Sequence, residues 1–161
     1  MNREKSTATF EYIDVKLRCG DTPAKDLGPR RDCAARGIAY FTGKKFHTVR
    51  KMLNEYNGTD SLNGTRMYAI IKVMEDLGYR RIDALCKHPD TLDTFFNVNK
   101  IRRTGLRAVL TSVTHLTVIE NGKIMDTYNC GRRWVDNVWV HNDDFAKAKA
   151  MIKEWRAAWK T

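Results

Sequence analysis

Cys33 is the residue whose setting in this chain points most directly to chemistry. The spacing of apolar residues after it predicts a helix over 33–42, which Gly43 would end in a left-handed conformation. Asp32 is expected to cap this helix by accepting a backbone N–H on its carboxylate. A cysteine in the first turn of a helix feels the positive end of the helix dipole, which favours the nucleophilic thiolate.

A hairpin about eighty residues downstream supplies two further groups. Asn121-Gly122 separates two runs rich in β-branched residues, and this pattern predicts a two-residue turn between paired strands. In that register His115 and Asp126 share one face of the hairpin as diagonal neighbours. Asn129 falls on the opposite face. We therefore expect Asp126, rather than Asn129, to orient the imidazole.

Cys33, His115 and Asp126 together make a set known from thiol catalysis. The cysteine would be the nucleophile, the histidine the proton carrier and the aspartate the group that orients the ring. The structural alternative is that Cys33 is a small core residue, as free cysteines commonly are.

The same segments resemble a known family. The run Asp32-Cys33-x-x-Arg36-x-Ile38-Ala39 followed by Thr42-Gly43 is similar to the nucleophile helix of compact papain-like cysteine peptidases, which occur among small phage and bacterial proteins. The run from His115 to Thr127 is similar to their histidine and acid strands, and Asn63-Gly64-Thr65 before a helix ending at Leu77-Gly78-Tyr79 fits the middle of the pattern. The resemblance covers about residues 28–130. It implies a papain-like fold and hydrolysis of a peptide, isopeptide or related amide bond.

One departure from that pattern concerns the oxyanion hole. Papain-like enzymes commonly carry a glutamine a few residues before the cysteine, and this chain contains no glutamine. The backbone N–H of Cys33 is one available donor. Asp32, Asn129 and the backbone of 28–31 are the other candidates for oxyanion or orienting roles.

The basic character of the chain suggests an acidic partner. Lys and Arg number 29 against 19 Asp and Glu, which gives a formal charge of +10. Arg30-Arg31 directly precede Cys33, and Arg132-Arg133 lie among aromatic residues. We expect these pairs to attract an acidic protein or peptide substrate, with nucleic acid as the alternative partner. No nucleic-acid motif accompanies the charge, and a merely solvated basic surface is the structural alternative.

The sequence predicts no metal, cofactor or membrane span. Cys86-x-His88 could form a zinc site only together with the distant Cys130 and His141, and no metal-ligand spacing supports that set. No apolar run follows Met1, and no stretch approaches the length that crosses a bilayer. We therefore expect a cytoplasmic protein, in the host cytoplasm if it is of phage origin, with reduced cysteines. The oligomeric state is not predicted.

The elements that must position these residues follow from periodicity. Residues 1–161 are expected to form one α+β domain with N-terminal helices packed on a C-terminal antiparallel sheet and a final helix covering the sheet. The site would lie where the first helix meets the sheet. A polar loop over 58–64 is the expected mobile segment. The predicted helices span 33–42, 46–56 and 65–77, and a further helix begins at Pro89. A last helix, capped by Asn142 or Asp143, is predicted to run to about 160. The predicted strands span 9–17, 79–82, 106–113, 115–120, 123–128 and 133–140.

Overall fold

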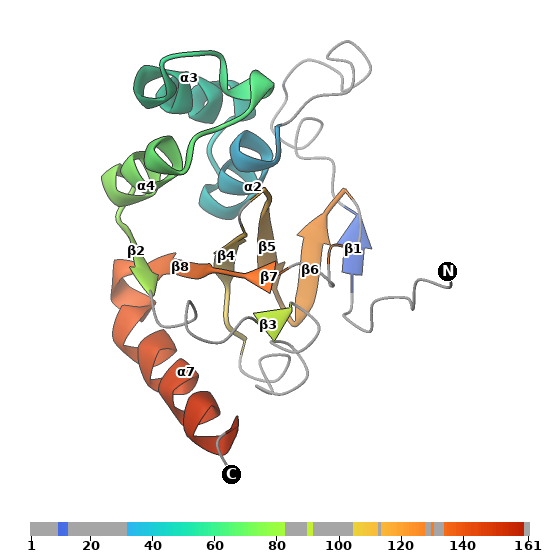
Figure 1. Cartoon of the computed structure of the whole chain (residues 1–161), viewed down its shortest axis with the longest axis vertical. Coiled ribbons are helices and arrows are strands. Elements are labelled where there is room, and N and C mark those ends of the chain that lie inside the picture. The colour runs from blue at the N-terminus through green and yellow to red at the C-terminus, as the bar shows by residue number, and fades with distance from the viewer. Residues whose placement is uncertain are drawn as a thin grey trace.

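A six-stranded sheet lies at the centre of the computed structural model, which describes residues 10–12, 32–82, 90–91, 105–112, 114–127, 130 and 134–159 (Figure 1). The strand order is β1-β6-β5-β4-β8-β2, and β1 pairs with β6 in parallel while every other neighbouring pair is antiparallel. The strands are β1 (Phe10–Tyr12), β2 (Tyr79–Ile82), β4 (Ala108–Thr111), β5 (Leu116–Glu120), β6 (Lys123–Asp126) and β8 (Asn137–His141). A separate pair joins β3 (Asp90–Thr91) to β7 (Trp134–Val135).

Helices cover both faces of this sheet, so the described architecture is α+β (Figure 1). On one face, α2 (Cys33–Thr42), α3 (Phe46–Asn57) and α4 (Met67–Asp76) bury their apolar sides against sheet residues such as Val109, Val118 and Trp139. On the other face, α7 (Phe145–Trp159) packs through Ala148 and Ile152. In α3 and α4 the buried residues form one side of the helix, as expected for amphipathic helices, whereas α2 is buried along most of its residues. The coarse class and the final covering helix are thus as predicted.

The closest approach between a helix and the sheet occurs at Gly37 in α2. A Cβ atom placed on Gly37 would lie 2.2 Å from Cδ2 of Leu116 at the start of β5. Leu116 is 2% exposed, so its side chain has little room to move away. A glycine inside a helix weakens that helix, but here it lets the backbone of α2 rest against β5. The helix that begins at Cys33 and the strand that directly follows His115 are therefore in direct contact.

The predicted hairpin has the expected register. Glu120 pairs with Lys123 and Val118 with Met125, and the turn residues Asn121 and Gly122 have φ values of 51° and 72°. A positive φ at both central residues is what the type I′ turn requires.

Several element predictions need correction. Asp90 and Thr91 form β3 against β7, where the proline at 89 suggested a helix. The strand predicted over 133–140 is divided at Asp136, whose N–H bonds to the carbonyl oxygen of Thr111 at 2.8 Å. The final helix follows a short 3-10 turn, η4 (Asn142–Asp144), whose cap is His141 rather than Asn142 or Asp143. The edge strand β1 lies parallel to β6, which no local pattern could indicate because its partner is more than a hundred residues away.

Candidate active site

The nucleophile helix begins at Cys33, with Asp32 at the N-cap position. The predicted carboxylate cap is wrong, because the Asp32 side chain caps no backbone N–H and instead forms an ion pair with Arg36 one turn later. The Asp32 carboxylate is only 4% exposed. At such a buried position a hydrogen bond from the charged Arg36 guanidinium is stronger than one from a neutral backbone N–H, so the carboxylate pairs with Arg36. Gly43 ends the helix with a φ of 73°, as predicted.

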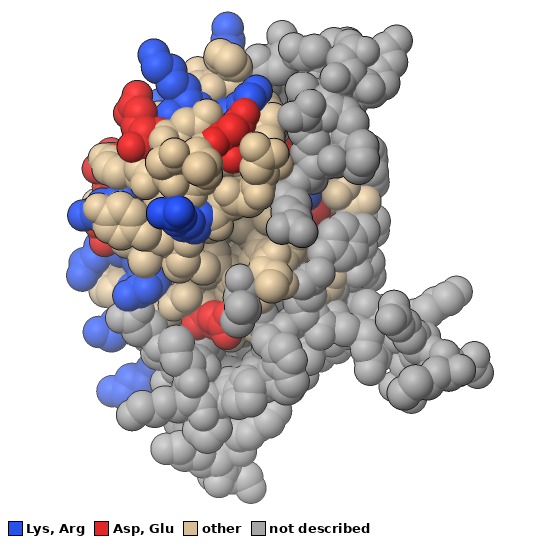
Figure 2. Space-filling model, turned by 45° about the horizontal axis from the view of Figure 1, so that its top comes forward, with Lys and Arg blue, Asp and Glu red and all other residues tan. Residues whose placement is uncertain are grey.

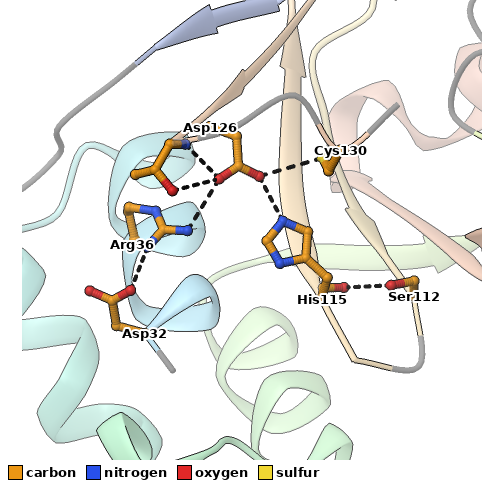
Figure 3. Close-up of polar contacts among 7 residues, drawn as sticks. Asp32, Arg36, Ser112, His115, Asp126 and Cys130 are labelled. Carbon is orange, nitrogen blue, oxygen red and sulfur yellow. Dashed lines mark hydrogen bonds and ion pairs between the residues drawn. The ribbon is translucent and has the colours of Figure 1, made fainter. Parts of the chain in front are cut away.

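His115 and Asp126 meet across the hairpin as the register implied. Nε2 of His115 lies 2.7 Å from Oδ2 of Asp126, and both side chains are buried (Figure 3). The carbonyl oxygen of His115 accepts hydrogen bonds from the backbone N–H of Ser112 at 2.8 Å and from its hydroxyl at 3.3 Å. The turn before β5 is thereby fixed, and so is the direction in which the imidazole leaves the backbone.

Cys33 and His115 lie close enough for each to change the pKa of the other. Burial alone would raise the pKa of the Cys33 thiol, but the hydrogen bond from His115 and the charges of His115 and Arg36 outweigh burial and lower it. Burial alone would lower the pKa of His115, but hydrogen bonds with Asp126, Cys130 and Cys33 raise it to about 12. Both directions favour a thiolate–imidazolium pair.

Asp126 has partners beyond the histidine. Its Oδ1 accepts from Nη2 of Arg36 at 3.1 Å and from the backbone N–H of Thr127 at 2.7 Å (Figure 3). Its Oδ2 also accepts from the thiol of Cys130 at 3.5 Å. Burial tends to raise the pKa of this carboxyl, but the His115 bond and charge, with a contribution from Arg36, hold it below its usual range. The acid is therefore kept ionised beside the ring.

Arg36 and Cys130 are the site residues that the triad prediction missed. Helical spacing offered a signal for Arg36, because it lies three residues after Cys33 and so on the same side of the helix. Cys130 offered none, since it follows the end of β6 and its direction is not set by a regular element.

A cleft of about 640 Å³ opens beside the thiol. One side is formed by the beginning of α2 and another by the turn that leads into β5, so Cys33 and His115 both border the cleft. The opposite side comes from the segment that leads into α4. The residues lining these sides include Cys33, Ala34, Gly64, Thr65, Met67, Ile70, Ser112, Thr114, His115 and Thr127.

The loop that forms this opposite side is held by buried amide groups rather than left free. Nδ2 of Asn57, itself 1% exposed, donates to the carbonyl oxygen of Gly64 at 3.0 Å, and its Oδ1 accepts from the N–H of Arg66 at 2.8 Å. Asn54 accepts the N–H of Ser61 at 2.7 Å at the start of η2 (Ser61–Asn63). The segment expected to be mobile is therefore fastened to α3 on both sides of the short 3-10 helix.

His115, Asp126 and Cys130 also form a group of metal-ligand type, with their ligand atoms within 4.8 Å of one another. Nitrogen, oxygen and sulfur ligands of this kind suit zinc. Two neighbouring charges oppose a cation here, namely the Arg36 guanidinium on Asp126 and the proton that His115 holds with a pKa of about 12. A metal would have to displace that proton, because imidazole binds metals in its neutral form.

The remaining predicted residues are less informative. Asn129, Arg30, Arg31, Arg132 and Arg133 lie outside the described residues, as do Cys86 and His88 of the zinc alternative. The fourth member of that alternative, His141, contacts Asp143 through Nδ1 at 3.2 Å.

Basic side chains are scattered over the helical end of the molecule, with acidic side chains among them (Figure 2). Several of the described basic residues form separate ion pairs, such as Arg50 with Asp60 and Arg107 with Glu120. Part of the positive charge of the described residues is therefore neutralised by nearby carboxylates.

Comparisons with known proteins give no relative. No family model, no curated protein and no solved structure matches the chain. Among the described residues, no helix combines the length and the apolar character needed to cross a bilayer.

Proposed function

We propose that this protein is a papain-like thiol hydrolase that cleaves a peptide, isopeptide or related amide bond with Cys33, His115 and Asp126. The observation that carries the proposal is the position of His115. Its ring contacts Asp126 through Nε2 at 2.7 Å, its interaction with the Cys33 thiol lowers the pKa of that thiol, and both Cys33 and His115 border an open cleft. That is the order of contacts that a nucleophile, a proton carrier and an orienting acid require.

The first half of the reaction would form a thioester. The Cys33 thiolate attacks the carbonyl carbon of the scissile amide and makes a tetrahedral oxyanion. The imidazolium of His115 gives its proton to the departing nitrogen as the C–N bond breaks, which leaves an amine product and an acyl-cysteine. Asp126 remains ionised throughout and stabilises the imidazolium.

The second half would return the free enzyme. Neutral His115 takes a proton from a water molecule as its oxygen attacks the thioester. The C–S bond then breaks, the carboxylic product leaves, and the thiolate–imidazolium pair is restored.

The backbone N–H of Cys33 is the described donor best placed for the oxyanion, because the N–H groups of the first helical turn have no partner within the helix. Asp32 does not fit the donor role that the sequence allowed for it. Its carboxylate is paired with Arg36 and accepts hydrogen bonds rather than donating them.

A peptidyl electrophile that traps active-site thiolates tests the proposal. The wild-type protein should be labelled, Cys33→Ala should not be, and His115→Ala should be labelled at least about a hundredfold more slowly. Cys86→Ala serves as the control, because it removes a thiol outside the triad. Equal labelling of wild type and Cys33→Ala, in proteins with matching circular dichroism, would refute the nucleophile assignment.

A non-catalytic binding module on the same fold is the second candidate. The net charge of +10 favours it, since a basic protein attracts acidic proteins and nucleic acid whether or not it has activity. In that case Cys33→Ala should bind its partner normally, while Arg30→Ala/Arg31→Ala should weaken the binding and flatten its salt dependence.

A further inference from the structure

Arg36 is a buried charge that the proposed chemistry does not use. It lies on α2 one turn after Cys33 and is only 9% exposed. Its guanidinium is placed between two carboxylates, Asp32 through Nη1 and Asp126 through Nη2 (Figure 3). It therefore connects the helix that carries the nucleophile to the strand that carries the acid.

This contact fixes how the Asp126 carboxylate is turned. Oδ1 faces Nη2 of Arg36 at 3.1 Å while Oδ2 faces Nε2 of His115 at 2.7 Å. Rotation of the carboxylate about its Cβ–Cγ bond would break both contacts at once. The guanidinium is a rigid planar fork that can hold two carboxylates at fixed angles, which a lysine ammonium cannot do.

The charges around Arg36 alternate in sign. The order is thiolate, imidazolium, carboxylate, guanidinium and carboxylate, from Cys33 through His115, Asp126 and Arg36 to Asp32. In a buried site each charge needs a neighbour of opposite sign. Without Arg36, the carboxylates of Asp32 and Asp126 would lose the cation that lies between them, and Cys33 would lose a nearby positive charge.

We propose that Arg36 is a positioning residue that aims Oδ2 of Asp126 at His115 and supports the negative charge on Cys33. This role rests on the proposed thiol chemistry at the same site. A purely structural alternative exists, in which the Arg36–Asp126 ion pair only fastens α2 to β6. The test must therefore measure a property of Cys33 that a loss of folding stability alone would leave unchanged.

The pH dependence of Cys33 alkylation by iodoacetamide is such a measurement, because it needs no knowledge of the natural substrate. In Arg36→Gln we expect the midpoint of the rate profile to move upward by about one pH unit, with a roughly tenfold slower rate below the midpoint. Arg36→Lys keeps the cation but cannot hold both carboxylates, so its midpoint should fall between those of wild type and Arg36→Gln.

Arg50→Gln is the matched control. This variant breaks a bidentate ion pair between Arg50 on α3 and Asp60, away from Cys33. It should therefore lower the melting temperature and leave the midpoint of the Cys33 alkylation profile unchanged. If Arg36→Gln fails to fold, Arg36→Gln/Asp32→Asn removes the cation together with one of its two carboxylates and should show the same upward shift.

Two negative results are distinguishable. If the wild-type midpoint is already low and the Arg36 variants keep it while losing stability, Arg36 is only structural and the proposal is overturned. If wild-type Cys33 titrates like an ordinary thiol, with a midpoint near about 8.5, the proposed function itself fails and the role of Arg36 fails with it.

Discussion

Gly37→Ala should damage both the fold and the reactivity of Cys33, because the added methyl group meets buried Leu116. The new Cβ would lie 2.2 Å from Cδ2, whereas ordinary van der Waals contact begins at 3.4 Å, so the two atoms must separate by about 1.2 Å. Overpacking of this kind costs about 1–3 kcal/mol. Alanine returns about 0.5–1 kcal/mol through its better helix propensity. From the middle of these two ranges, the net loss in the free energy of unfolding is about 1–1.5 kcal/mol.

For a chain of this size that loss lowers the melting temperature by roughly 2–6 °C. The effect on chemistry arises because α2 can relieve the clash by moving away from β5, which lengthens the bond between Cys33 and His115. We expect slower alkylation of Cys33 at pH 7, by about tenfold for each unit by which its pKa rises. Calorimetry and mass-resolved iodoacetamide labelling measure the two effects separately.

Leu116→Val provides the compensating change, because it shortens the side chain that the new methyl group meets. The double variant Gly37→Ala/Leu116→Val should melt higher than Gly37→Ala alone and should recover part of its alkylation rate. The reasoning is refuted if Gly37→Ala melts at or above the wild-type temperature with unchanged labelling. In that case α2 would not need the glycine to approach the sheet.

Other changes test the remaining parts of the site. Brief iodoacetamide treatment at neutral pH should label Cys33 far faster than Cys130, which is 3% exposed; equal labelling would contradict the lowered pKa of Cys33. Asp126→Ala should lower turnover of a cleavable peptide by orders of magnitude, and a loss below tenfold would remove the acid from the mechanism. The pKa of His115 is raised from 6.5 to about 12, so its contribution to stability is complete below pH 6.5 and is lost as the pH rises through about 12. The difference in melting temperature between wild type and His115→Gln should therefore shrink as the pH rises toward about 12. A difference that stays constant with pH would argue against the imidazolium. Asp126 has a lowered pKa, so its contribution is present above pH 3.8 and is lost as the pH falls through the lowered value, which melting of Asp126→Asn against wild type checks. Asn57→Ala should cost about 1–3 kcal/mol in denaturant unfolding because it removes the buried amide that bonds the backbone of Gly64 and Arg66, and a loss below about 0.5 kcal/mol would show that the loop is held by other contacts.

The parts of the site that could be predicted are those set by local rules. The turn at Asn121-Gly122 fixes a register, and the register places His115 and Asp126 on one face. Helix periodicity and Gly43 likewise fix the extent of α2. These features depend on neighbours a few residues apart, which a single sequence displays.

The parts that could not be predicted depend on which of several available partners a polar side chain takes. Asp32 has the residue type of a helix cap, but the side chain of Arg36 takes its carboxylate. The loop over 58–64 has the composition of a free loop, but the amide of Asn57 holds its backbone. In each case the preferred partner is identified only when the tertiary contacts are known.

The contact between α2 and β5 also determines how reactive the Cys33 thiol is before the chain has folded. Cys33 lies on a helix early in the sequence, and His115 directly precedes a strand about eighty residues later. A nascent or denatured chain therefore carries a thiol with an ordinary pKa, which is mostly protonated at pH 7 and reacts slowly. The pKa of Cys33 is lowered only when the sheet packs against the helix. The Cys33 thiol would thus be protected from oxidation and unwanted acylation during synthesis. The rate at which Cys33 is alkylated would also report how far folding has progressed.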